Sequence, residues 1–193
     1  MPNVLISELD PSPALIGSDL LLVQHAAGPP ADYCTMVQVS TYMLLAHAFI
    51  YISAPAATTV TNQNTFYKMA GTTTLGNSTL FTMPTNNRAL YSGTAARDIF
   101  LNCSITFNCS NNAQNIGFQV WKFTAATNTG AYLTSSLMAR TITVGANSVV
   151  VSLCASDTAN TGDYFEIHTN NATSGGTTVT AQYMSLMVQA TLQ

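Results

Sequence analysis

The sequence predicts an all-β fold, an antiparallel β-sandwich preceded by an extended N-terminal arm and one short helix. The first observation is the segment 98–110, where apolar and polar residues alternate with the two-residue period of a half-buried strand. The second is a series of short strand-like runs, separated by turn residues, from residue 65 onward. The third is composition: 28 Thr and 16 Asn among 193 residues favour strands and turns.

Charged residues are scarce, which bears on the class of protein. They make up 7% of the chain, about a quarter of the usual share. The hydrophobic fraction of 47% excludes a disordered composition. A surface of Thr, Asn and Ser is weakly hydrated and favours a protein that functions in an assembled state. The net charge of −3, without a basic run, argues against nucleic-acid binding.

Residues 1–40 are expected to form an arm rather than a domain, because their apolar runs are short and interrupted by Pro and Gly. Leu20–Val23 and Thr35–Val39 are the two short strands expected within it. The arm carries four acidic and no basic side chains, so it carries −4 and the remainder of the chain +1. These carboxylates either dock on a basic partner surface or are solvated.

Four short motifs follow one another in the arm: Ile6-Ser7-Glu8-Leu9, Gly17-Ser18-Asp19-Leu20, Val23-Gln24 and Val37-Gln38-Val39-Ser40. In this order they resemble the N-terminal attachment segment of bacteriophage fibre and appendage proteins. His25 and the Gly28-Pro29-Pro30 stretch depart from that pattern. The resemblance implies that the arm attaches the chain to a virion protein. The attachment residues it implies are Ile6, Ser7, Glu8, Leu9, Gly17, Asp19, Leu20, Val23 and Gln24.

Residues 41–64 are expected to form a short helix and a linker. Ser40 or Thr41 can cap a helix over Tyr42–Ile52, which is apolar on all sides and would therefore be buried. It would pack between subunits or on its own domain. Its candidate interface residues, at three-four spacing, are Tyr42, Leu45, Phe49 and Ile52. Small residues and Thr in Ser53–Asn64 indicate a linker.

The predicted sandwich occupies residues 65–193. Its expected strands are Thr65–Met69, Leu80–Met83, Ala89–Ser92, Asp98–Ser110, Ile116–Thr124, Ala131–Ala139, Thr141–Val144, Val149–Cys154, Tyr164–Thr169 and Val179–Leu192. Cys103 and Cys109 fall on the apolar face of one strand, so reduced core thiols are expected. Asn102 and Thr106 on its polar face point to water or to a neighbouring subunit, and the low charge favours the neighbour. Trp121 is expected in the core or at a subunit seam rather than as a sugar-stacking platform.

The end of the chain carries a second resemblance. A Thr161-Gly162-Asp163 turn leads into a strand, a polar loop over Thr169–Gly176 and a closing hydrophobic strand. This order resembles the last strands of tumour-necrosis-factor (TNF) and C1q-like jelly rolls, which phage fibre and decoration proteins also use. The resemblance covers residues 60–193. It implies a jelly-roll sandwich that forms a tight homotrimer, with the chain ends near one pole.

Catalytic and cofactor-binding patterns are not found. The sequence has no G-x-S-x-G, P-loop or G-x-G-x-x-G motif, and its three histidines are far apart, so we expect neither an enzyme, a metal site nor a cofactor. Tyr164, Glu166 and His168 form one polar stripe of a strand, either a functional contact or a solvated or inter-subunit face. Four N-x-S/T triplets begin at Asn77, Asn102, Asn108 and Asn171, but no signal peptide precedes them, and no apolar run is long enough to span a bilayer.

The function expected is that of a bacteriophage virion structural protein. It would be a homotrimeric capsid decoration protein or short head fibre, assembled in the host cytoplasm and bound to the major capsid or another virion protein. A short tail fibre or receptor-binding tip, touching a host-surface glycan or receptor, is the alternative; the short linker favours the head. A secreted C1q/TNF-like ligand is the alternative from another class.

Overall fold

The computed structural model describes residues 20–23, 32–35, 46–144 and 147–190. The chain divides into two units, residues 1–44 and 45–193. In the first unit β1 (Leu20–Val23) pairs antiparallel with β2 (Asp32–Thr35). The expected strand at Leu20–Val23 is confirmed, whereas the second strand begins before Thr35 and the remainder of the predicted range lies outside the described residues.

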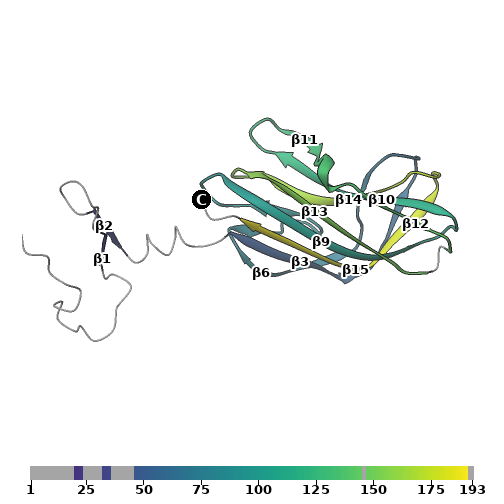
Figure 1. Cartoon of the computed structure of the whole chain (residues 1–193), viewed down its shortest axis with the longest axis horizontal. Helices are drawn as coiled ribbons and strands as arrows, with labels where there is room; N and C mark the ends of the chain where they lie inside the picture. Colours follow the sequence, from purple (N-terminus) through teal and green to yellow (C-terminus); the bar gives the residue numbers. More distant parts are fainter. Residues whose placement is uncertain (1–19, 24–31, 36–45, 145–146, 191–193) are drawn as a thin grey trace, which may run out of the picture. The chain divides into compact units, whose positions relative to one another are not determined.

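The second unit is a sandwich of two antiparallel sheets (Figure 1). The six-stranded sheet has the order β13-β9-β15-β3-β6, with β4 also paired to β15. Its strands are β3 (His47–Ala54), β4 (Ala57–Val60), β6 (Thr72–Thr79), β9 (Arg97–Cys109), β13 (Val149–Ala159) and β15 (Thr177–Ala190).

The seven-stranded sheet has the order β11-β10-β14-β8-β7, with β12 paired to β10 and β5 to β14. Its strands are β5 (Tyr67–Lys68), β7 (Phe81–Thr82), β8 (Ala89–Tyr91), β10 (Gln114–Thr124), β11 (Thr129–Tyr132), β12 (Met138–Ile142) and β14 (Tyr164–Asn171). The all-β class and the antiparallel sandwich are therefore confirmed.

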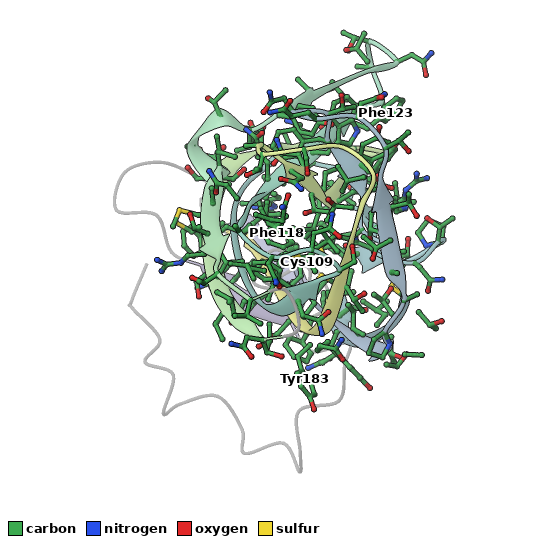
Figure 2. All side chains as sticks on the ribbon, turned by 90° about the vertical axis from the view of Figure 1, so that its right-hand side faces the viewer. Cys109, Phe118, Phe123 and Tyr183 are labelled. Atoms are coloured by element: carbon green, nitrogen blue, oxygen red, sulfur yellow. The ribbon has the colours of Figure 1, made fainter. Side chains whose placement is uncertain are left out.

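Strand β9 supplies much of the core, as its alternation predicts. Cys103 is fully buried and Cys109 is 5% exposed; both are free thiols, and burial raises the pKa of Cys103 far above its ordinary value. Phe107 meets Phe118 of the opposite sheet edge to face, with ring centroids 4.7 Å apart. Seen from the end of the sandwich, Phe118 and Cys109 lie between the layers, whereas Tyr183 points away from them (Figure 2).

The helix predicted over Tyr42–Ile52 is wrong in its described part, because β3 occupies His47–Ala54. Here Ala48 and Ile50 are buried while Phe49 and Tyr51 are exposed, which is a strand period. Pairing with β15 on one side and β6 on the other satisfies the backbone of this apolar segment. β-branched and aromatic residues such as those of β3 favour a paired strand over a helix.

The linker predicted over Ser53–Asn64 is also corrected, since β3 continues to Ala54 and β4 occupies Ala57–Val60. Strand β6, Thr72–Thr79, was not expected. Both segments are short and rich in Thr, and both complete the six-stranded sheet at its margins. Their composition is equally typical of loops, so pairing with β15 and β3, rather than local sequence, decides their conformation.

The single strand predicted over Ala131–Ala139 is broken into β11, a 3-10 turn at Thr134–Ser136, and β12. The buried Ser136 explains the break. Its hydroxyl accepts a hydrogen bond from Val120 N (2.9 Å) and donates one to Leu133 O (2.6 Å). The turn thus supplies a hydrogen-bond acceptor for the backbone N–H of Val120, at the point of β10 that lies between its pairings with β11 and β12.

The sandwich begins and ends at one place. Ala190 N at the end of β15 donates to Ala46 O, just before β3, at 2.7 Å. The Thr161-Gly162-Asp163 turn is confirmed: Gly162 has a φ of +87°, and the carboxylate of the buried Asp163 accepts hydrogen bonds from Asn160 N and Ala125 N.

None of the described segments forms a helix that could reach across a bilayer.

Candidate functional site

Glu166 lies at the centre of a side-chain cluster on the outward face of the seven-stranded sheet. Neighbours along β14 alternate, so Phe165 and Ile167 enter the core and Glu166 points away from it. Glu166 is nevertheless only 4% exposed, because charged and aromatic side chains surround it. Together they form what we call the Glu166 cluster: Lys68, Arg88, Trp121, Tyr132, Glu166 and His168.

Two cations neutralise the Glu166 carboxylate. Lys68 Nζ and Arg88 Nε each lie 2.7 Å from its Oε1. Lys68 ends β5 and Arg88 directly precedes β8, and both of these strands pair with β14. Their side chains are 32% and 28% exposed. The cluster therefore presents cations to solvent and keeps its carboxylate covered.

His168 connects the carboxylate to a phenol. Its Nε2 lies 3.3 Å from Glu166 Oε2, and its Nδ1 lies 3.2 Å from Tyr132 Oη. An ionised carboxylate can only accept, so Nε2–H donates to Glu166, and in the neutral ring Nδ1 accepts from the Tyr132 hydroxyl. The Tyr132 oxygen keeps its lone pairs for another donor.

Electrostatics fix the charge of the cluster. Burial by itself would raise the pKa of Glu166, but hydrogen bonds from His168, Lys68 and Arg88 and the charge of Lys68 outweigh burial and lower the pKa to about 2. Burial raises the pKa of Tyr132. At neutral pH the cluster thus contains an ionised carboxylate and a neutral phenol, and its net charge is +1 when His168 is neutral.

Aromatic rings extend the cluster across the sheet. Trp121 on β10 pairs with Glu166 on β14 and with Tyr132 on β11, so three neighbouring strands contribute one row. The Trp121 ring stacks on His168, with centroids 5.5 Å apart and planes 15° apart, and meets Tyr132 edge to face at 4.7 Å. Arg88 continues the row through its contact with Glu166.

The same face continues beyond the cluster. Phe123 stacks on Tyr164 with centroids 4.7 Å apart, and the guanidinium carbon of Arg88 lies 3.9 Å above the centre of the Tyr164 ring. Gly130 leaves the room that Trp121 occupies, because a Cβ there would collide with the indole ring. These contacts hold the guanidinium and the indole in fixed orientations.

A second candidate site is the outward face of the six-stranded sheet. It exposes six large apolar side chains, which we call the apolar face: Phe49, Tyr51, Phe100, Val150, Tyr183 and Met187. Strand register aligns Phe49, Met187, Asn102 and Cys154 in one row. Among the described outward residues of β3, β6, β9, β13 and β15, Asp98 alone carries a permanent charge.

A row of small hydroxyl side chains crosses the middle of this face. Ser185, Ser104 and Ser152 lie directly opposite one another on β15, β9 and β13. The next row contains Tyr183, Thr106 and Val150. Small side chains between bulky ones let a second surface approach the sheet closely.

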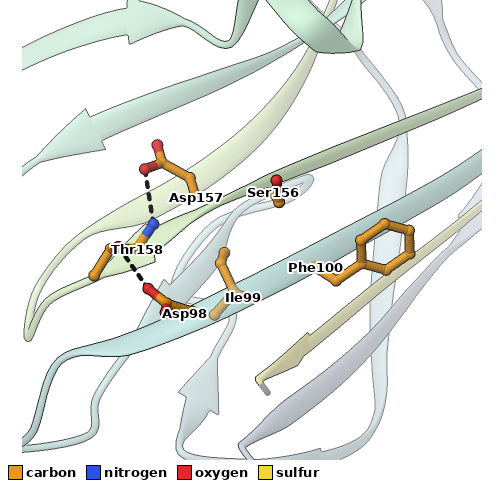
Figure 3. A pocket seen from close by; sticks show the side chains of 6 residues that line it. All are labelled: Asp98, Ile99, Phe100, Ser156, Asp157 and Thr158. Atoms are coloured by element: carbon orange, nitrogen blue, oxygen red, sulfur yellow. Dashed lines mark hydrogen bonds between the residues drawn. The ribbon is translucent and has the colours of Figure 1, made fainter. Parts of the chain in front are cut away.

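Two hollows open on this side. One, of about 370 Å³, is lined by β9 and β13 residues: Asp98, Ile99, Phe100, Ser156, Asp157 and Thr158 (Figure 3). Its carboxylates already accept hydrogen bonds, Asp98 from the Thr158 hydroxyl at 2.8 Å and Asp157 from Thr158 N at 2.7 Å. The other, of about 210 Å³, adjoins Phe49 and Met187. Within the described part of the chain, no three His, Cys, Asp or Glu side chains gather to hold a metal ion.

The sequence-predicted candidates fall on different surfaces. Phe49, Asn102 and Thr106 share the outward face of the six-stranded sheet, whereas Trp121 lies on the other sheet. Ile52 is half-buried and packs against the core. Of the arm candidates, Leu20 and Val23 belong to β1. The remaining candidates lie outside the described residues: Ile6, Ser7, Glu8, Leu9, Gly17, Asp19, Gln24, Tyr42 and Leu45.

The stripe of Tyr164, Glu166 and His168 is confirmed as one face of β14, but its central carboxylate is covered rather than solvated. The sequence did not indicate its partners Lys68 and Arg88. They lie 98 and 78 residues away from Glu166. No local spacing in the sequence links either residue to Glu166.

No protein-family model and no curated protein matches this chain. The solved structure of Eiger TNF from S. frugiperda is similar, with a TM-score of 0.54 and 11% identity over 77% of this chain and 93% of that one. Murine APRIL at pH 5.0 also aligns, with a TM-score of 0.48 and 9% identity over 75% of this chain and 99% of that one. The likeness to Eiger confirms that the sandwich is a TNF-like jelly roll.

Proposed function

We propose that this chain is a non-enzymatic structural protein of a bacteriophage virion, assembled as a homotrimer through its apolar face. The observation that carries the proposal is that face itself. Among the described residues, six of the ten exposed large apolar side chains gather on this one sheet, in a chain that has few charged residues. Contiguous apolar patches on a soluble protein mark sites of association.

Physical chemistry favours a second copy of the chain as the occupant. Fully burying a Phe, Met or Val side chain stabilises by about 1.5–3 kcal/mol, and these are already partly covered, so about 1 kcal/mol each is available. The nearly uncharged face brings little repulsion when copies meet. Asn102 and Thr106 can pair with the same groups on a neighbour. Three copies are proposed because the TNF and C1q-like resemblance implies a trimer.

Attachment to a virion rests on the arm. Its four motifs resemble phage attachment segments, and its −4 charge would suit a basic docking surface. The sandwich begins at β3, immediately after the arm region, so no long shaft separates arm and sandwich. This short spacing in the sequence favours a capsid decoration protein or short head fibre over a tail fibre, whose receptor-binding tip normally stands away from the particle.

A secreted TNF-like ligand is the second candidate, and the jelly-roll fold is the observation that favours it. One residue argues against it. Asn102 begins an Asn-Cys-Ser triplet in the centre of the apolar face. Glycosylation there in a secretory pathway would set a bulky sugar chain inside the proposed trimer.

Labelling of purified virions with an antibody against the sandwich tests the role. We expect label on particles, at the head, and loss of label when residues 2–40 are deleted while the deletion variant stays soluble and trimeric. Normal incorporation of the deletion variant would refute anchoring by the arm. A protein found only in the medium of eukaryotic cells, and never on particles, would favour the ligand.

A further inference from the structure

We propose that the Glu166 cluster is a binding site for an acidic saccharide, a sugar that bears a carboxylate. The site lies on the seven-stranded sheet, whereas the apolar face belongs to the six-stranded sheet. Phe123 and Tyr183, one from each sheet, lie on opposite sides of the sandwich (Figure 2). The inference rests on the proposed function only in that assembly through the apolar face leaves this side free.

The charges of the cluster exceed what a structural role needs. The chain has five Lys and Arg residues, and two of them converge on one carboxylate. A single cation would neutralise Glu166, and apolar side chains could hold the three strands as well. The second cation leaves a surplus of +1. Because Lys68 and Arg88 are about one-third exposed while Glu166 is covered, the surplus is offered to solvent.

Arg88 is oriented for a second carboxylate. Its Nε is occupied by Glu166, and its guanidinium plane is held over the Tyr164 ring. A guanidinium has five N–H donors in a planar fork, so the terminal nitrogens can still donate to an incoming anion. Such charge-assisted hydrogen bonds are among the stronger polar contacts available at a protein surface.

The aromatic rings supply the remaining part of a sugar site. Trp121 and Tyr132 are half-buried and fixed by ring contacts with each other and with His168, so little side-chain freedom would be lost on binding. The Tyr132 oxygen can accept a hydrogen bond from a sugar hydroxyl. The row from Tyr132 to Arg88 crosses four neighbouring chain segments, about 14 Å at the usual strand spacing.

Other macromolecules suit this surface less well. Nucleic acid needs many cations along a backbone, and this cluster has only two, Lys68 and Arg88, beside one carboxylate. A protein partner would bury large apolar side chains, and most of the strongly exposed ones lie on the other sheet. An anionic ring with polar hydroxyls and an apolar C–H face matches both the cations and the indole.

Fluorescence provides a direct test, because Trp121 is the only tryptophan in the chain. The full-length protein is titrated with sialyllactose and with trigalacturonic acid. In parallel it is titrated with two neutral counterparts: lactose, which is sialyllactose without its acidic residue, and maltotriose, a neutral α-1,4-linked trisaccharide. We expect a saturable change in emission with at least one acidic probe, and binding of its neutral counterpart at least about tenfold weaker. No saturable change with either acidic probe at millimolar concentration, or equal affinity for acid and neutral sugar, would overturn the proposal.

Matched variants separate binding from folding. Arg88→Gln should weaken binding at least about tenfold. Arg97→Gln, which removes a cation from β9 of the other sheet, should bind as the original chain does. Tyr132→Phe keeps the ring and loses the hydroxyl, so it should weaken binding severalfold while circular dichroism is unchanged. Unaltered affinity in folded Arg88→Gln, or in Tyr132→Phe if Arg88→Gln does not fold, would contradict the site.

The assembly variant Met187→Asp keeps this test independent of the proposed function. It changes the apolar face and should dissociate trimers, yet the Trp121 response to the acidic sugar should persist. Loss of trimers with retained binding supports both proposals. Persistent trimers with retained binding would refute only assembly through that face. Loss of binding in a folded Met187→Asp monomer would refute a site contained in one chain.

Discussion

Replacing the central carboxylate, Glu166→Gln, should destabilise the sandwich at neutral pH. The change leaves Lys68 and Arg88 without an anionic partner. Breaking a fully buried ion pair costs about 3–5 kcal/mol, but these cations are about one-third exposed and can be rehydrated, so we expect about 2 kcal/mol. For a domain of this size the melting temperature should fall by about 4–8 °C.

The pH dependence of this difference tests the electrostatic explanation. The pKa of Glu166 is lowered from 4.5 to about 2, so its contribution is complete above pH 4.5 and is lost as the pH falls towards 2. Each pH unit in that window removes at most about 1.4 kcal/mol, so a contribution of about 2 kcal/mol is lost by about pH 3. Thermal unfolding followed by circular dichroism should show a constant difference between the original chain and Glu166→Gln from pH 7 to pH 4.5, and convergence of the two between pH 4.5 and pH 3.

The control for that experiment is Asp98→Asn, which removes the charge of an exposed carboxylate of β9 and keeps an oxygen that can accept from the Thr158 hydroxyl. Its free energy of unfolding should differ from that of the original chain by less than about 0.5 kcal/mol at pH 7. A Glu166→Gln variant as stable as the original at pH 7, or a difference that stays constant down to pH 3, would refute the account of the cluster.

Three further substitutions test the other parts. Asn87→Ala should cost about 3 kcal/mol in chemical denaturation, because this buried residue with φ +56° binds the β14 backbone; a loss under 1 kcal/mol would refute that link. Asn102→Lys or Thr106→Lys should lower trimer stability in dilution series more than melting temperature, and unchanged trimers in both would return this face to solvent. Gly130→Ala should displace Trp121 and shift its emission; an unchanged spectrum would contradict the contact.

Local pattern was enough for the long strands. Strand β9 could be predicted because thirteen residues alternate strictly, and its Cys103 and Cys109 accordingly lie in the core. The Thr161-Gly162-Asp163 turn and the strand β14 that follows it could be predicted for a similar reason, since Gly162 and Asp163 have strong turn preferences. These features are determined by residues close together in the sequence, so they can be predicted from it.

Features that depend on contacts between residues far apart in the sequence could not be predicted from it. Strand β3 is apolar enough to suggest a buried helix, and only its pairing with β15 and β6 makes it a strand. The Glu166 cluster depends on contacts of Lys68 and Arg88 across 98 and 78 residues, which no local spacing encodes. Of that cluster, only the alternation of β14 could be predicted. Trp121 was expected in the core or at a subunit seam, but it lies half-buried on the outward face of the seven-stranded sheet, beside Glu166.

Native mass spectrometry of the full chain tests the central claim, assembly through the apolar face, most directly. The original protein should give an ion series at three times the 20.5-kDa mass of the chain. The Met187→Asp variant, folded by circular dichroism, should give the mass of one chain. A stable monomer of the original protein, or a trimer that survives a charge in the middle of the apolar face, would contradict the account.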